Sequence, residues 1–191
     1  MKLLVTGGAG YIGSVVAAMA LHEGHQVTVL DDLSTGHADA VPAGAAFAEG
    51  RVHDLARTQA LLADGVDAVL HFAAKSLVAE SVATPGRYWE NTLGGTLALL
   101  EAMRVTGVSS IVFSSTAAVY GEPERTPIDE TAPTRPTSPY GASKIAVDTA
   151  PIRCILACSA SAVSTATLVA PYGLVGRVGA VSSIGVRSGS P

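Results

Sequence analysis

The chain has 191 residues, of which 48% are hydrophobic and 5% aromatic, and it contains 20 glycines. That length allows one well-buried domain and part of a second. The net charge of −4, without any run of Lys or Arg, excludes an electrostatic surface for nucleic acid. An apolar strand pattern follows Met1 and Lys2 directly, in place of a secretory leader, so we expect a cytoplasmic protein in a reducing compartment.

Strand and helix patterns alternate along the first 150 residues. Strands are predicted at 2–6, 26–30, 45–49, 67–72 and 110–114, and helices at 11–23, 54–63, 88–105 and 139–149. Asp54 and Ser138 are placed to cap two of these helices and Gly107 to end a third, while the prolines from 123 to 139 indicate a long loop. The alternation predicts an α/β fold, a Rossmann-like doubly wound parallel sheet that binds ligands beyond the carboxyl ends of its strands.

The tail, 151–191, differs in composition. It has no Asp, Glu or Lys, and its uncharged stretch between Arg153 and Arg177 contains Ser, Thr and Pro, which disfavour a membrane span. Cys154 and Cys158 lack the partners that a zinc site needs, so we expect no metal, and a redox or metal protein is a minor alternative. A tail without acidic residues is the composition expected when a GC-rich gene is translated out of frame. We therefore expect a frameshift or truncation near Thr149.

Glycines spaced three residues apart lie between the first predicted strand and helix. Gly7 permits a tight turn, Gly10 lets backbone amides approach a pyrophosphate, and Gly13 permits close packing of helix and strand. The alternative, a merely glycine-rich turn, is disfavoured by the strand-turn-helix context. Asp31 ends the second strand, where a carboxylate can accept hydrogen bonds from both ribose hydroxyls and would repel the extra phosphate of NADP. The sequence therefore predicts NAD, against the alternative of an ordinary polar strand end.

Three hydroxyl- and ammonium-bearing residues form a candidate catalytic group. Tyr140 and Lys144 are at i and i+4 of a predicted helix, and a cation near a phenol favours the phenolate, which is a usable general base. Alone, this pair is also typical of a solvated helix face. Thr116, at the end of the preceding strand, offers a hydroxyl that can bond the substrate oxygen while Tyr140 takes its proton.

Together these motifs resemble the UDP-glucose 4-epimerase family, NAD-dependent epimerases and dehydratases of the extended short-chain dehydrogenase class. The resemblance covers 1–148 and rests on the glycine turn and on segments 30–36, 71–74, 80–82, 91–96, 113–121 and 138–144, in order. It implies that hydride leaves C4 of a UDP-hexose for bound NAD and returns to the other face of a 4-keto intermediate. It implies a homodimer, with Thr116, Tyr140 and Lys144 catalytic and the first two contacting the sugar. The NAD contacts it implies are Gly7, Gly10, Tyr11, Ile12, Gly13, Asp31, Asp32, Thr35, Phe72, Ala73, Ala74, Asn91, Ser114 and Lys144.

Local differences from the family narrow the function. The 4,6-dehydratases carry an Asp-Glu pair after the Thr, where this chain has Ala117 and Ala118, so elimination of water is disfavoured. A related reductase or another nucleotide-sugar epimerase stays open. Arg51 replaces an Asp that meets the adenine, which removes one acceptor. No smaller substrate domain and no continuing strand is recognisable after Thr149, so an inactive NAD-binding fragment is the second hypothesis.

Overall fold

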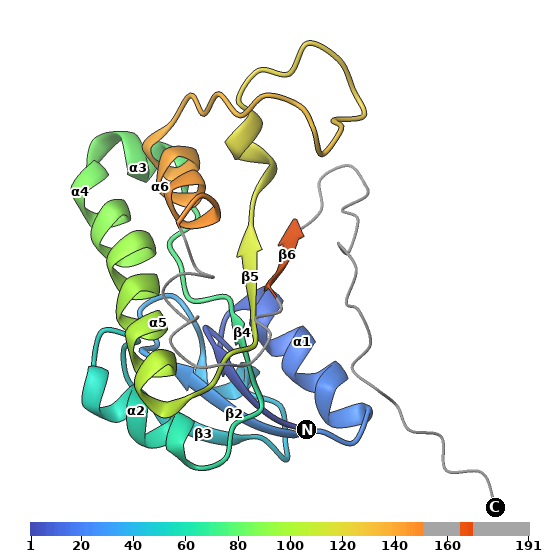
Figure 1. Ribbon diagram of the computed structural model, residues 1–191, viewed down its shortest axis with the longest axis vertical. Coiled ribbons are helices and arrows are strands. Elements are labelled where there is room, and N and C mark those ends of the chain that lie inside the picture. The colour runs from blue at the N-terminus through green and yellow to red at the C-terminus, as the bar shows by residue number, and fades with distance from the viewer. Residues whose placement is uncertain (151–164, 170–191) are drawn as a thin grey trace, which may run out of the picture.

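Parallel strands form the centre of the structure (Figure 1). A computed structural model of the protein describes residues 1–150 and 165–169. In these residues six strands form one parallel sheet in the order β3-β2-β1-β4-β5-β6. Their bounds are β1 Lys2–Thr6, β2 Gln26–Asp31, β3 Ala46–Glu49, β4 Ala68–His71, β5 Ile111–Ser115 and β6 Thr165–Val169. The strand order reverses between β1 and β4, where a doubly wound sheet has its ligand crevice. The predicted fold class is confirmed.

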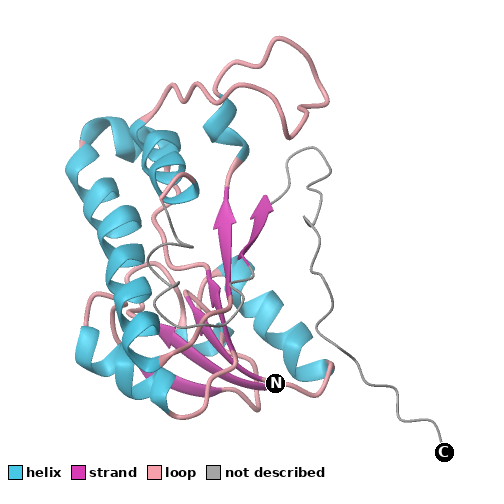
Figure 2. Cartoon of the chain, in the orientation of Figure 1, coloured by secondary structure: helices cyan, strands magenta, loops and turns pink. Residues whose placement is uncertain are grey.

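Helices cover both faces of this sheet, and one long loop extends beyond it (Figure 2). The α-helices are α1 Tyr11–His22, α2 Leu55–Ala63, α3 Val78–Ala83, α4 Pro85–Tyr88, α5 Gly95–Thr106 and α6 Pro139–Asp148. A π-helix, η2, runs over Trp89–Gly94, and 3₁₀-helices occur at η1 Ala38–Ala40 and η3 Ala117–Tyr120. Among the described residues, no helix is long and apolar enough to cross a membrane.

Alternate residues of each strand pack on opposite faces, because the side-chain period of a strand is two. On β1, Leu3 and Val5 belong to the cluster that packs under α1 with Ala17 and Ala20. Leu4 belongs to the other cluster, which α2 and α5 cover. The central strands are therefore buried on both faces, as an α/β sheet requires.

The predicted helix ends are largely confirmed. Asp54 caps α2 by accepting a hydrogen bond from the Arg57 amide at 3.0 Å, and Ser138 caps α6 through the Gly141 amide at 3.2 Å. Gly107 ends α5 in the left-handed region, with φ +77°. The helix predicted at 88–105 is wrong in two respects, because helical structure begins at Pro85 and passes through the π-turn η2.

Helix α3, strand β6 and the 3₁₀-helices η1 and η3 were not predicted. Helix α3 has six residues and no side-chain cap, so neither periodicity nor a cap signals it. The expectation of no strand after Thr149 was wrong, since β6 pairs in parallel with β5. Cys154, Cys158 and the rest of the tail outside Thr165–Val169 lie beyond the described residues.

Candidate active site

The turn between β1 and α1 is glycine-rich because it passes close to other backbone. Gly7 has φ +74°, and a Cβ there would lie 2.5 Å from the backbone nitrogen of Ala73. A Cβ on Gly13 would collide with the carbonyl oxygen of Gly7, to which the Gly10 amide donates at 3.1 Å. The first amides of a helix have no intrahelical partner. The turn thus forms an open cradle beside the positive end of α1, which suits a pyrophosphate.

The three residues that follow the turn differ in what they can contribute. The side chain of Tyr11 is 88% exposed and that of Ile12 is also exposed. Any contribution of these two residues to the cradle therefore comes from their backbone amides. Gly13 is buried, and its role is the close packing of α1 on the turn, as the sequence predicted.

The carboxylate of Asp31 is held rigidly at the end of β2. Its Oδ2 accepts a hydrogen bond from the Ala9 amide at 3.0 Å, and its Oδ1 accepts one from the Leu33 amide at 2.9 Å. Each carboxylate oxygen has a second acceptor position. Asp31 therefore ties the glycine turn to β2 and still has acceptor capacity for the two hydroxyls of a ribose.

Arg51 carries the positive charge at this end of the site. Its Nε lies 3.7 Å from Asp32 Oδ2, and one terminal nitrogen lies 3.8 Å from Glu90 Oε1. Partial burial raises the pKa of Asp32, but hydrogen bonds from Ser34 and the charges of Arg51 and Lys75 outweigh it, so the net shift is downward. Arg51, which stands where the family pattern has an Asp, thus bridges the end of β2 and η2.

The segment after β4 forms the opposite wall. The Asn91 side chain, on η2, accepts a hydrogen bond from the Lys75 amide at 3.0 Å and so fixes this segment. The two walls line an open cleft. The predicted NAD contacts that line it are Gly7, Gly10, Asp31, Asp32, Thr35, Phe72, Ala73, Ala74 and Asn91.

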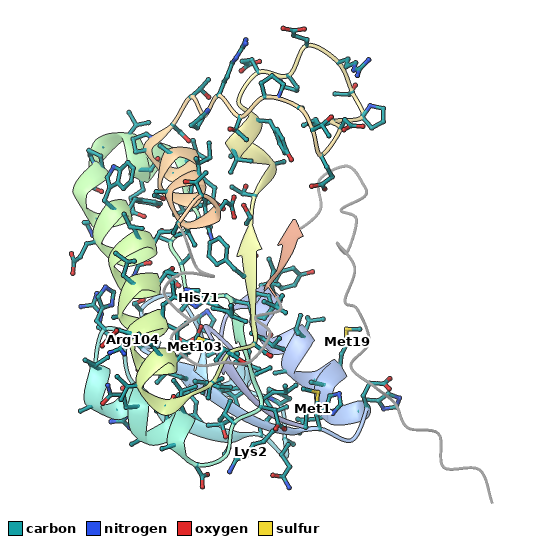
Figure 3. All side chains as sticks on the ribbon, in the orientation of Figure 1. Met1, Lys2, Met19, His71, Met103 and Arg104 are labelled. Atoms are coloured by element: carbon teal, nitrogen blue, oxygen red, sulfur yellow. The ribbon has the colours of Figure 1, made fainter. Side chains whose placement is uncertain are left out.

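His71 lies in the interior beneath this cleft (Figure 3) and is 1% exposed. The Thr96 hydroxyl donates to the Thr92 carbonyl at 2.6 Å, so its oxygen accepts the proton of His71 Nε2, at 3.1 Å. The His71 Nδ1 atom then accepts from the Thr6 hydroxyl at 2.6 Å. Burial, with a smaller contribution from the Lys144 charge, lowers the pKa of His71 to about 3. A neutral imidazole thus joins β1, β4 and α5 just before the glycine turn.

Thr116 lies where β5 passes into η3. Its Oγ1 accepts a hydrogen bond from the Ala118 amide at 3.2 Å. The hydroxyl proton is therefore available to a substrate oxygen, which agrees with the predicted role.

Lys144 and Tyr140 lie one turn apart on α6, as predicted. Lys144 Nζ donates to the Ser114 carbonyl at 2.7 Å and lies 4.5 Å from the centre of the Phe113 ring. Burial lowers the pKa of Lys144 to about 8, and the Asp148 carboxylate acts in the opposite direction. The ammonium is thus held against β5 and 4% exposed. Ser114, Thr116, Tyr140 and Lys144 are not part of the cleft lining. Of these four, Ser114 and Lys144 contact each other directly.

Known proteins match both the sequence and this arrangement. The family model described as "NAD dependent epimerase/dehydratase family" matches residues 3–181. The chain belongs to this family. It is similar to a UDP-glucose 4-epimerase of Streptomyces lividans, with 59% identity over 149 residues, which are 77% of this chain and 45% of that relative.

Solved epimerase structures share the family fold. One is UDP-glucose 4-epimerase from Brucella ovis in complex with NAD, at 40% identity and TM-score 0.78, over 88% of this chain and 51% of that one. Another is UDP-glucose 4-epimerase from Bifidobacterium longum in complex with NAD⁺ and UDP, at 34% identity and TM-score 0.80, over 87% and 52%. This member of the epimerase/dehydratase family therefore spans about half the length of the relatives it matches.

Two residues of this family member contribute to the packing around Tyr140 but had no role assigned to them from the sequence. A Cβ on Gly141 would lie 2.6 Å from the Ala118 carbonyl oxygen, so a glycine next to Tyr140 lets α6 approach η3. Tyr88 is fully buried and its ring meets that of Tyr140 edge-on, with centroids 6.2 Å apart. The Tyr88 hydroxyl lies 2.7 Å from the Leu77 carbonyl and 2.8 Å from Glu80 Oε2. Only the buried-aromatic character of Tyr88 is visible in sequence.

Proposed function

We propose that residues 1–150 form the NAD-binding, catalytic half of a UDP-hexose 4-epimerase, interconverting UDP-glucose and UDP-galactose. The glycine cradle supports NAD binding, because Cβ atoms at Gly7 and Gly13 would collide with the backbone that shapes it, and the Asp31 carboxylate suits the adenosine ribose. Relatives of known structure carry NAD, one of them with UDP. NAD, when bound, supplies a reversible hydride acceptor for C4 of the hexose.

The chain's own residues handle the proton. The Thr116 hydroxyl donates a hydrogen bond to the substrate O4 and so orients that oxygen. Tyr140 takes the O4 proton as C4 is oxidised and returns it when C4 is reduced from the other face. Lys144, one helical turn from Tyr140 and held by the Ser114 carbonyl, places a positive charge next to this step.

The single observation that carries an epimerase over a dehydratase is the packing of the residues after Thr116. Dehydratases need an acid and a base there. Here Ala118 has its carbonyl directly beneath Gly141 of α6, and neither it nor Ala117 carries a side chain that can transfer a proton. A redox-neutral epimerisation requires only the Thr, Tyr and Lys that are present.

A second candidate function is an NAD-binding fragment without turnover. It is favoured by the length of the chain, since 149 aligned residues are only 45% of the Streptomyces lividans relative. Binding energy from remote parts of a substrate is needed to hold the transition state.

The deciding experiment uses the purified chain and a chimera of residues 1–148 with the second half of the Streptomyces lividans relative. NAD retention is measured by absorbance after denaturation, and conversion of UDP-galactose by coupled assay. We expect both proteins to hold NAD and the chimera to epimerise, with turnover abolished by Tyr140→Phe. A folded, NAD-loaded chimera without turnover would overturn the epimerase assignment. Turnover by the unfused chain would overturn the hypothesis of an inactive fragment.

A further inference from the structure

Helix α6 has three chemically different side chains at intervals of four residues, Tyr140, Lys144 and Asp148, and such residues share one helix face. The first two belong to the proposed catalytic group, and Asp148 has no role in it. Consecutive residues of β5 hold the other two. The Ser114 carbonyl accepts from Lys144 Nζ at 2.7 Å, and the Ser115 hydroxyl donates to Asp148 Oδ2 at 2.5 Å. The ammonium and the carboxylate are thus fixed one helical turn apart, each by its own partner.

The side chains and backbone that contact Lys144 directly are uncharged. The side chain is 4% exposed, its hydrogen-bond acceptor Ser114 is uncharged, and the Phe113 ring lies 4.5 Å away. A buried ammonium is costly unless an opposite charge compensates it. Burial alone lowers the pKa of Lys144 towards neutrality, and Asp148 opposes this.

The titratable groups that face this pair come from three elements. Asp148 lies on the same helix as Lys144, His71 faces Lys144 from β4, and Tyr120 of η3 faces Asp148. His71 is neutral because of its own burial. Burial raises the pKa of Asp148 above its usual value, and the Ser115 hydrogen bond and the Lys144 charge reduce this rise without reversing it. Asp148 is the one acidic side chain among these groups.

We propose that Asp148 is a positioning residue, held by Ser115, that keeps the ammonium of Lys144 charged at neutral pH. It acts on the reaction through Lys144 and touches no reacting atom. Its effect on Tyr140 rests on the proposed function, whereas the coupling of the two charges does not. Without the carboxylate, the buried lysine loses its proton more easily.

The chain suits a direct test because it has only three lysines, Lys2, Lys75 and Lys144. The ¹³Cε signals of labelled lysine are followed by NMR against pH in the full chain, and Lys144→Met assigns the third signal. Asp148→Asn keeps an oxygen for Ser115 and removes the charge. We expect it to lower the apparent pKa of Lys144 by about one unit or more.

A matched control and a second variant complete the design. Asp64→Asn removes a carboxylate that pairs with Lys2 at 2.5 Å, and it should leave the titration of Lys144 unchanged. Ser115→Ala keeps the charge and releases it, so a smaller fall for Lys144 is expected.

An unchanged Lys144 titration in folded Asp148→Asn would overturn the proposal, and so would an unchanged titration in Ser115→Ala if the first variant does not fold. A shifted titration in a chain that neither binds NAD nor supports turnover in the chimera would refute the proposed function and leave the coupling intact.

Discussion

The buried histidine makes the stability of the fold depend on pH. His71 donates through Nε2 to Thr96 and accepts through Nδ1 from Thr6, so both ring nitrogens are used and the ring has one proton. A second proton would replace the acceptor for Thr6 by a donor and place a charge in the core. The folded protein therefore resists protonation of this ring, and the unfolded chain does not.

The size of the effect follows from the two pKa values. The pKa of the imidazole is 6.5 in the unfolded chain and about 3 in the folded one. Between these values the unfolded chain binds a proton that the folded chain excludes, so stability falls as the pH falls from 6.5 towards 3. At about 1.4 kcal/mol per pH unit, His71 alone removes about 2 kcal/mol of stability between pH 7 and pH 5.

Urea unfolding at pH 7 and pH 5, followed by circular dichroism and by the fluorescence of the single tryptophan Trp89, measures this difference. His71→Asn removes the titrating ring and retains an amide near Thr6, so its loss between the two pH values should be smaller by about 2 kcal/mol. The exposed His22 provides the control, since His22→Asn should keep the full loss. Equal losses for wild type and His71→Asn would refute the assigned protonation state.

Two further predictions concern local packing. Gly141→Ala places a Cβ 2.6 Å from the Ala118 carbonyl oxygen, so α6 must move and the free energy of unfolding should drop by about 1–3 kcal/mol. Both variants are measured by thermal unfolding, and Gly86→Ala, whose Cβ meets nothing within 4 Å, should not be destabilised. Equal losses of stability in the two variants would contradict the close approach of α6 and η3. Asp54→Ala removes the hydrogen bond from the Arg57 amide and should lower the free energy of unfolding in urea by about 1 kcal/mol. Asp54→Asn keeps a side-chain oxygen at the helix start and should change this free energy little. An equal loss in both variants would contradict the capping role of Asp54.

Most of the fold was predictable because its signals are local. Apolar strands and caps such as Asp54 depend on neighbouring residues, and the strand-helix alternation leaves few topologies. The π-turn at 89–94 was not predictable, because a helix with one extra residue per turn has nearly the same apolar period. Strand β6 was missed because its five residues lie in a Ser/Ala-rich tail without a clear hydrophobic period. Its place in the sheet comes from pairing with β5.

The candidate site divides in the same way. Gly7, Gly13 and Asp31 were predicted with roles that the geometry supports, because backbone sterics and strand ends are sequence-local properties. The tautomer of His71 and the partner of Asp148 depend on threonines and serines from distant elements. Such contacts leave no periodic signal in a single sequence.

The division of labour within the family bears on what this chain can do. The cradle, the Thr116 hydroxyl and the Tyr140–Lys144 pair all lie within residues 1–150, which correspond to about half of a relative. On the proposed function, cofactor binding and proton transfer are therefore separable from the grip on the nucleotide. Residues 1–150 expressed alone would have the reacting groups without the binding energy that the transition state needs. They should thus bind NAD and show weak sugar affinity and little turnover, without switching to another reaction.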